Sequence, residues 1–147
     1  MQETPDQVVQ LVLQGRQYGL PLDQVERIIP IAALRPVPQA QPHWLGLLDL
    51  HQTSVPVLDL PGLLGLHPRK PFTVDAAIII VRVPGAQTGF LVDDVIGVTR
   101  VARGAWQRRS GLSAGGDDCI AVTHTRDGLL MLLDAQQLLA GEPIGSG

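Results

Sequence analysis

Strand-length apolar stretches, each followed by turn residues, run along most of the chain. Several of them alternate between apolar and polar residues, which is the period of a strand buried on one face. Turn signals at intervals of about 8–12 residues are typical of β-sandwiches and barrels. We predict nine or ten short strands, of which the clearest are Val8–Gln14, Tyr18–Leu22, His43–His51, Ser54–Leu58, Ala76–Val83, Thr88–Val92, Gly97–Ala102, Cys119–Thr125 and Gly128–Leu133.

Short helical segments are predicted between the strands, each after an aspartate. An aspartate side chain can accept a hydrogen bond from the free N–H groups of a first helical turn. The helical segments are Gln24–Ile29, Leu60–Leu64 and Ala135–Ala140, and the aspartates are Asp23, Asp59 and Asp134, while Asp93 opens a turn at Asp93–Ile96. Pro30–Pro42, with four prolines, is predicted to be an extended connection, and Arg103–Asp118 a mobile loop.

The pattern occurs twice along the chain. Residues 8–28 align without a gap with residues 78–98, at an offset of 70, and residues 45–65 align with residues 120–140, at an offset of 75. Because the two blocks recur in the same order, we interpret the chain as two copies of one unit. The identical pairs include Gly15 and Gly85, Gly19 and Gly89, Asp23 and Asp93, and Asp59 and Asp134.

The repeat and the strand pattern together predict a mainly β fold of two small barrels packed over one shared core. The run Ala76–Val81 is apolar at every position. A strand that is buried on one face only would carry polar residues at alternate positions. We therefore expect this strand to lie at the shared core.

Composition excludes several classes of partner. The net charge is −3, and the 11 basic residues are scattered, with Arg108-Arg109 as their only compact cluster, which argues against nucleic-acid binding. No apolar run approaches the roughly 20 residues that span a bilayer, so direct membrane insertion is not expected. A single cysteine, Cys119, excludes an intrachain disulfide and is typical of a cytosolic protein. The polar N-terminal residues lack the pattern of a signal peptide.

No catalytic or metal site is predicted. The four histidines lack metal-ligand spacing, no serine follows a strand in an elbow, and the glycine-rich stretches lack the lysine of a phosphate cradle. Asp93-Asp94 is a carboxylate pair, but the repeat marks Asp93 as a structural turn residue. Trp106 is either a docking anchor or a side chain that fastens its loop. We expect a protein that is not an enzyme and binds no cofactor.

The order of these elements resembles the CheW-like family, adaptor domains that couple chemoreceptors to the chemotaxis histidine kinase. The likeness extends from about Val8 to Leu139. It rests on Gly19-Leu20-Pro21-Leu22 with Val25 and Ile28, Pro36-Val37-Pro38, Gly46-Leu47-Leu48-Asp49-Leu50, Pro56-Val57-Leu58-Asp59-Leu60 with Leu64-Gly65, Gly89-Phe90-Leu91-Val92-Asp93 with Val95 and Val98, and Leu132-Leu133-Asp134 with Leu138-Leu139.

The resemblance implies two five-stranded SH3-like barrels around a common hydrophobic centre. It implies one domain over residues 8–141, made of subdomains at about 8–70 and 76–141 that either stay separate or exchange strands, with disordered tails at 1–7 and 142–147. It also implies a cytoplasmic scaffold without an active site, which binds the regulatory domain of the kinase and the cytoplasmic tip of a chemoreceptor. Carried over position by position, the receptor groove involves Val25, Arg27, Ile28, Gly46, His51, Val92 and Val95.

Two positions depart from the family pattern. The family usually has an acidic residue where this chain has Arg27, and it favours Arg-Gly where this chain has His51-Gln52. These changes either alter pairing with ordinary receptors or are drift at tolerant positions. Two alternatives to a chemotaxis adaptor stay open: the same role in a type IV pilus or other non-flagellar pathway, and a small-ligand sensor or enzyme that uses the inter-barrel groove.

Overall fold

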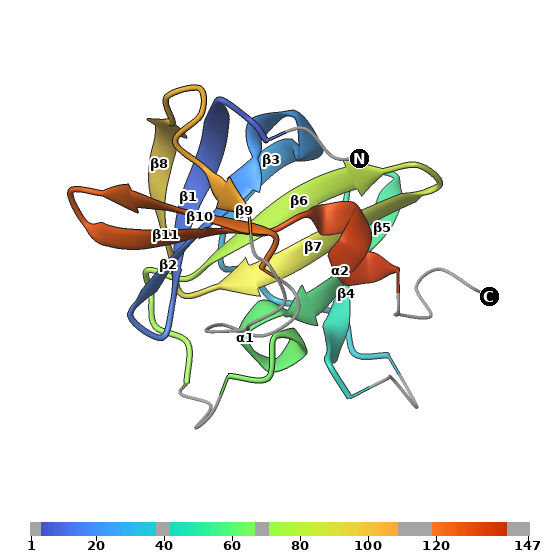
Figure 1. Ribbon diagram of the computed structural model, residues 1–147. Helices are drawn as coiled ribbons and strands as arrows, with labels where there is room; N and C mark the ends of the chain where they lie inside the picture. Colours follow the sequence, from blue (N-terminus) through green and yellow to red (C-terminus); the bar gives the residue numbers. More distant parts are fainter. Residues whose placement is uncertain (1–3, 38–41, 67–70, 109–118, 141–147) are drawn as a thin grey trace.

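The computed structural model describes residues 4–37, 42–66, 71–108 and 119–140, which form two β-sheets with a few short helices (Figure 1). The elements, in chain order, are β1 (Gln7–Leu13), β2 (Arg16–Pro21), the 3-10 helix η1 (Leu22–Gln24), β3 (Val25–Pro30), β4 (Trp44–Leu50), β5 (Thr53–Asp59), α1 (Leu60–Leu63), β6 (Ala77–Val83), β7 (Ala86–Val92), β8 (Asp94–Arg100), β9 (Gln107–Arg108), β10 (Ala121–Thr125), β11 (Gly128–Leu132) and α2 (Ala135–Leu139). The predicted mainly β fold is confirmed.

The two sheets share one strand order once the repeat is applied. The six-stranded sheet has the order β8-β1-β2-β11-β10-β9, and the five-stranded sheet has the order β3-β6-β7-β5-β4. The offsets of 70 and 75 residues relate β1 to β6, β2 to β7, β3 to β8, β4 to β10 and β5 to β11. Substituting each strand by its repeat mate converts the first order into the second, except for the additional strand β9. In both sheets a parallel pair, β2 with β11 or β7 with β5, completes an otherwise antiparallel arrangement.

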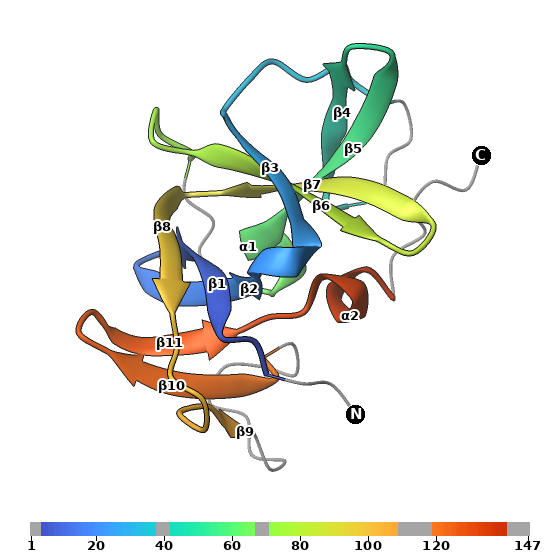
Figure 2. The ribbon, with the colours of Figure 1, turned by 90° about the horizontal axis from the view of Figure 1, so that it is seen from above.

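Each sheet takes strands from both halves of the chain. The hairpin β1–β2 lies in the sheet that holds β8, β10 and β11, and the hairpin β6–β7 lies in the sheet that holds β3, β4 and β5. Figure 2 shows the first sheet in the lower half of the view and the second in the upper half. The two copies have thus exchanged their first hairpins. The domain and subdomain boundaries given above stay a prediction.

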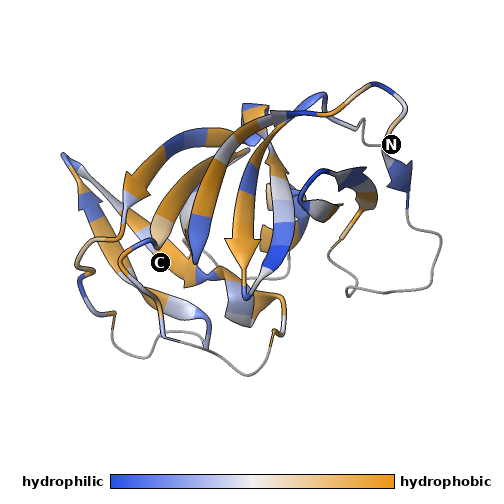
Figure 3. Cartoon of the chain, turned by 90° about the vertical axis from the view of Figure 1, so that its left-hand side faces the viewer, coloured by the Kyte–Doolittle hydropathy of each residue, from blue (hydrophilic) through white to orange (hydrophobic). Residues whose placement is uncertain are grey.

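The core follows from alternation along the strands. In β6, Ile79 and Val81 join the largest cluster, which lies between the sheets, while Ile78 and Ile80 join a second cluster within the five-stranded sheet. Both sets are fully buried, which explains why this strand is apolar at every position. Figure 3 shows apolar and polar bands alternating along several other strands. A third cluster, inside the six-stranded sheet, contains Val8, Val101, Trp106, Ala121, Leu130 and Leu132.

Two predicted helical or turn segments are strands in the structure. Residues 24–29 were expected to be helical, but Val25–Pro30 forms β3 and pairs with β6, and β8 likewise covers the turn expected at Asp93–Ile96. A β-bulge between Val25 and Arg27 breaks the two-residue period of β3. Apolar residues then stand at intervals of three and four, which imitates a helix. Pairing with a buried strand overrides that local pattern.

The loop expected over Arg103–Asp118 is partly structured. Gln107–Arg108 forms β9 and pairs with β10, and residues 109–118 lie outside the described residues. Trp106 is buried, and its indole N–H donates to the backbone oxygen of Pro5 at 2.8 Å. Trp106 therefore fastens its loop rather than presenting a docking anchor. Asp6, which was expected in a disordered tail, accepts a backbone hydrogen bond from Val101.

Candidate functional site

The strand β3 holds three of the predicted groove residues. It is the edge strand of the five-stranded sheet, so one side of its backbone has no strand neighbour among the described elements. Val25 is half-buried and packs against the shared core, whereas Arg27 and Ile28 are exposed, Ile28 at 41%. An exposed isoleucine beside an arginine on an edge strand is a surface that a partner can cover.

A cleft of about 210 Å³ brings Arg27 and His51 together, although they are 24 positions apart in the sequence. Glu26, Arg82 and Gln87 also line it. His51 was predicted to end a strand, but it lies in the turn between β4 and β5, with a positive φ of 50°. The structure thus places the two residues that depart from the family pattern in one site.

Within the cleft, Glu26 is fully engaged. Arg82 donates to its carboxylate through Nη2 at 2.8 Å and through Nε at 3.1 Å, and the amide of Gln87 donates to it at 2.6 Å. The hydrogen bonds from Arg82 hold the pKa of Glu26 below its ordinary value. None of the described residues forms a salt bridge or a side-chain hydrogen bond with Arg27. The guanidinium of Arg27 therefore has no hydrogen-bonded partner among the described residues, although its charge contributes to the lowered pKa of Glu26, and the imidazole of His51 lines the same cleft.

Gly46 has a structural role in this geometry. It follows a β-bulge in β4, with a φ of 149°, a conformation that side chains rarely adopt. A Cβ at this position would lie 2.7 Å from the backbone oxygen of Arg35. That oxygen accepts a hydrogen bond from Leu47, which closes an isolated bridge between two segments of chain. The glycine permits a close backbone approach, so no contact of its own with a partner is needed to explain it.

The two valines of the predicted groove are less accessible than expected. Val92 is fully buried in the shared core, so it has no surface to offer a partner, and Val95 is half-buried against the same core. The prediction missed Ile96 and Val98 on the edge strand β8, which are 53% and 56% exposed. The repeat contained the necessary signal, because Val98 is the mate of Ile28.

Of the four aspartates, Asp134 makes the predicted capping contact, and Asp93 makes a contact that was not predicted. Asp134 accepts a hydrogen bond from the backbone N–H of Gln137 and caps α2, and Gln24 also donates to it. Asp93 accepts the backbone N–H of Gln14 at 2.6 Å and so links two turns. Asp59 precedes α1, but its side chain makes no capping hydrogen bond there.

Asp23 was expected to cap a helix and does not. It lies inside η1, whose side-chain cap is absent, and the residues after η1 form β3. Its repeat mate Asp93 binds the N–H of residue 14, and the mate of that residue is Pro84, which has no N–H. Both copies therefore have the carboxylate, but Asp23 lacks the backbone N–H donor that Asp93 binds.

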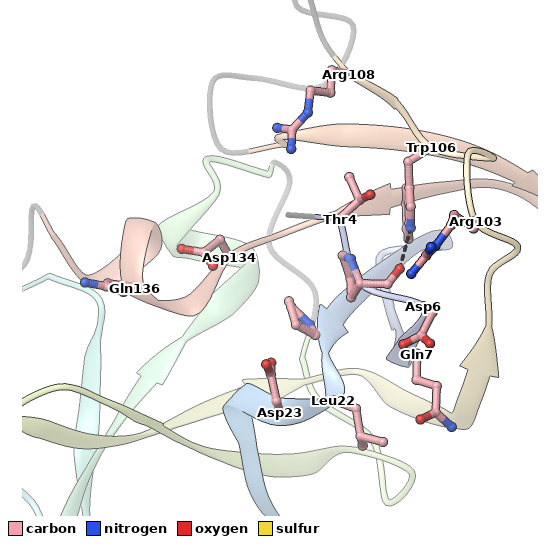
Figure 4. Close-up of a pocket in the computed structure, with 12 residues that line it drawn as sticks. Thr4, Asp6, Gln7, Leu22, Asp23, Arg103, Trp106, Arg108, Asp134 and Gln136 are labelled. Carbon is pink, nitrogen blue, oxygen red and sulfur yellow. Dashed lines mark hydrogen bonds between the residues drawn. The ribbon is translucent and has the colours of Figure 1, made fainter. Parts of the chain in front are cut away.

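A larger cleft, of about 1170 Å³, lies between the N-terminal segment, η1, the residues around β9, and α2 (Figure 4). Its charged lining residues are Asp6, Asp23, Asp134, Arg103 and Arg108. Because acidic and basic groups are mixed and Asp134 serves as a helix cap, the arrangement favours no one ligand charge. No group of three or more potential metal ligands occurs in the described part of the chain. Among the described residues, no helix is long and apolar enough to cross a membrane.

Comparison with known proteins identifies the family. The CheW-like domain matches residues 7–142. The chain is 27% identical over 129 residues to chemotaxis protein CheV3 of Helicobacter pylori, covering 83% of this chain and 40% of that protein. It is 23% identical over 133 residues to chemotaxis protein CheW of Thermotoga maritima, covering 90% and 87%, and 25% identical over 142 residues to CheW of Bacillus subtilis, covering 95% and 90%.

A solved structure shares the fold. The chain superposes on the scaffolding protein TtCheW of Thermoanaerobacter tengcongensis with a TM-score of 0.85, at 22% identity and over 97% of both chains. The likeness covers both sheets and confirms the predicted pair of barrels. With the family match over nearly its whole length, the chain belongs to the CheW-like domain family.

Proposed function

We propose that this protein is a cytoplasmic, non-catalytic adaptor in chemosensory signal transduction. It couples a chemoreceptor to the regulatory domain of a CheA-type histidine kinase. The family match and the CheW relatives support the adaptor role. The two edge strands support a receptor surface, because each sheet exposes apolar side chains at its edge.

The single observation that carries the receptor surface is the exposure of repeat-related residues. Ile28 on β3 and Val98 on β8 occupy matching positions and are 41% and 56% exposed. Ile96 adds a third exposed apolar side chain on β8. A helical hairpin can bury such side chains by laying its own apolar stripe across them. We place the receptor tip on this pair of edge strands.

Isothermal titration calorimetry tests the proposal with two purified probes. One is the regulatory domain of the kinase, and the other is a soluble fragment of a chemoreceptor hairpin tip, both from the same organism. Micromolar binding of each supports the adaptor role. Absence of heat with both probes at high micromolar concentrations refutes it.

A matched pair of variants tests the surface itself. Ile28→Ser with Val98→Ser is expected to weaken tip binding at least tenfold, because burial of each side chain contributes about 1–2 kcal/mol. Leu129→Ser is the control, since Leu129 is as exposed as Ile28 but lies on β11, away from both edge strands. Equal effects of the two changes on tip binding would contradict the assignment.

A further inference from the structure

The side chain of Gln24 joins two segments that lie 110 positions apart in the sequence. Its amide N–H donates to the carboxylate of Asp134 at 2.5 Å, and its amide oxygen accepts the backbone N–H of Ala135 at 2.8 Å. Because an ionised carboxylate only accepts hydrogen bonds, the amide satisfies both groups in one orientation only. We call these contacts of Gln24 with Asp134 and Ala135 the Gln24 clasp.

The clasp lies where the chain passes twice between the two sheets. Gln24 ends η1, which connects β2 of the six-stranded sheet to β3 of the five-stranded sheet. Asp134 follows β11 of the six-stranded sheet, and α2 then buries Ala135, Leu138 and Leu139 in the shared core. Figure 2 shows α2 beside the segment that leads into β3. The clasp therefore fastens the start of β3 to the start of α2.

The helix α2 depends on such support because it has only five residues. A helix of this length is not stable by itself in water. Its first turn also leaves backbone N–H groups without a helical partner. The clasp satisfies the N–H of Ala135, and the carboxylate of Asp134 satisfies that of Gln137 at 2.9 Å. Loss of the clasp should therefore let α2 open more often.

The other copy of the repeat cannot form this clasp. The repeat mates of Gln24 and Asp134 are Asp94 and Asp59. Asp94 accepts the backbone N–H of the following Val95 at 2.8 Å, and an ionised carboxylate has no proton to donate to a second carboxylate. The clasp is therefore a feature of one copy only, at the entry to the edge strand β3.

We propose that Gln24 is a positioning residue for the receptor edge strand β3, whose start it holds against α2. This inference rests on the proposed function. Gln24 directly precedes Val25, and Ile28 lies on the same face of β3, because the two pair with Val81 and Ile79, which both belong to the shared core. A strand that is held in place before binding has less freedom to lose when a partner covers it. Loss of the clasp should thus weaken receptor binding although no contact residue is changed.

Hydrogen exchange of backbone amides, followed by NMR, tests the clasp itself. In Gln24→Ala the amides of Ala135 and Leu138 are expected to exchange at least about tenfold faster, because two hydrogen bonds of the closed state are lost. Gln24→Glu should have the same effect, since its carboxylate faces that of Asp134. Gln136→Ala is the matched control, because Gln136 is an exposed glutamine of α2 whose side chain makes no hydrogen bond in the described part of the chain.

The double variant Gln24→Glu, Asp134→Asn reverses the polarity of the clasp. The new asparagine amide can donate to the new glutamate, whose second oxygen still accepts the N–H of Ala135, and the asparagine oxygen can still cap α2. Exchange of the α2 amides is expected to return to within about threefold of the wild-type rate. Recovery by a reversed pair shows that the hydrogen bonds, rather than the size of either side chain, hold the helix.

The same variants are then titrated with the receptor-tip fragment, at a temperature at which tryptophan fluorescence shows all of them to be folded. Gln24→Ala and Gln24→Glu are expected to weaken tip binding about three- to tenfold, because a smaller fraction of the protein has β3 in the binding geometry. The double variant is expected to restore binding, and Gln136→Ala to leave it unchanged.

The outcomes separate this inference from the proposed function. If the α2 amides of Gln24→Ala exchange at the wild-type rate, the clasp holds nothing and the inference is refuted. If exchange accelerates but the tip binds as tightly as to the wild type, Gln24 supports only α2, so the inference is refuted and the adaptor role stands. If the wild type itself binds no tip, the proposed receptor surface falls and this inference falls with it.

Discussion

Replacing Gly46 by alanine is expected to destabilise the protein strongly. The added Cβ would lie 2.7 Å from the backbone oxygen of Arg35 and 2.9 Å from the Cβ of Leu34. The oxygen cannot move freely, because Arg35 and Leu47 exchange two backbone hydrogen bonds, of 2.7 and 2.8 Å. Relief of the clash therefore requires displacement of the bridged segment.

The expected magnitude has two parts. A side chain at a φ of 149° costs about 1–3 kcal/mol in backbone strain. Forcing an extra methyl group into a packed position costs a further ~1–3 kcal/mol. The free energy of unfolding should fall by about 2–6 kcal/mol, against a total of about 5–15 kcal/mol for an ordinary domain.

Gly97→Ala separates the two parts. Gly97 has a similar φ of 144°, but a Cβ there would have no atom within 4 Å. It should lose only the strain energy, so the two variants are expected to differ by about 1–3 kcal/mol. Urea denaturation followed by tryptophan fluorescence measures both. If the two variants lost the same free energy of unfolding, within about 0.5 kcal/mol, the clash with Arg35 would be refuted. Gly46 would then again be a candidate for direct contact with a partner.

Three further predictions concern charged groups. Asp93→Ala should cost about 1–2 kcal/mol in urea denaturation, because it removes a charge-assisted hydrogen bond to the backbone, whereas its repeat mate Asp23→Ala should cost less than about 0.5. Glu26→Gln should make stability less sensitive to acid: the pKa of Glu26 is lowered by folding, so its contribution is complete above the ordinary value of 4.5 and is lost as the pH falls through the lower folded value. If thermal stability fell towards acidic pH by the same amount in the variant and in the wild type, the prediction would be contradicted. The double variant Arg27→Glu, His51→Arg should gain affinity for a receptor tip whose own adaptor has the usual family charges. A calorimetric titration that showed unchanged or weaker binding would contradict the interpretation that these two departures alter receptor pairing.

Much of the fold was predictable because the repeat constrains it. The segments β1 and β6, which start 70 residues apart, are recognisable as apolar strands, and α2 was placed correctly behind its aspartate cap. The exchange of first hairpins was not predictable, because two similar copies offer the same strand neighbours within a copy as between copies. The strands β3 and β9 were missed for different reasons, a bulge that imitates helical spacing and a length of two residues.

The candidate site was predictable only in part. The departures at Arg27 and His51 pointed to residues that share a cleft. The ion pair of Glu26 with Arg82 joins residues 56 positions apart across the bulged edge of the sheet, and no local pattern encodes it. Val92 was placed in the groove by the family resemblance, and its own pattern could not correct that, because an apolar residue in a β-strand looks the same whether it faces a partner or a second sheet. Only the packing of the two sheets decides between these faces.

The two edge strands have the same position in the two sheets but carry different chemistry. At the bulge, β3 has Glu26 in a salt bridge, whereas its repeat mate on β8 is the exposed Ile96. The repeat mate of Arg27 is Gly97, which has no side chain. A pair of identical edges would accept a two-stranded helical tip in two orientations related by the pseudo-symmetry. On the proposed function, the different side chains of the two edges remove that ambiguity, because the two orientations of the tip would no longer make the same contacts. The duplication supplies the shared scaffold, and on the proposed function the residues that differ between its copies set the direction in which a receptor tip binds.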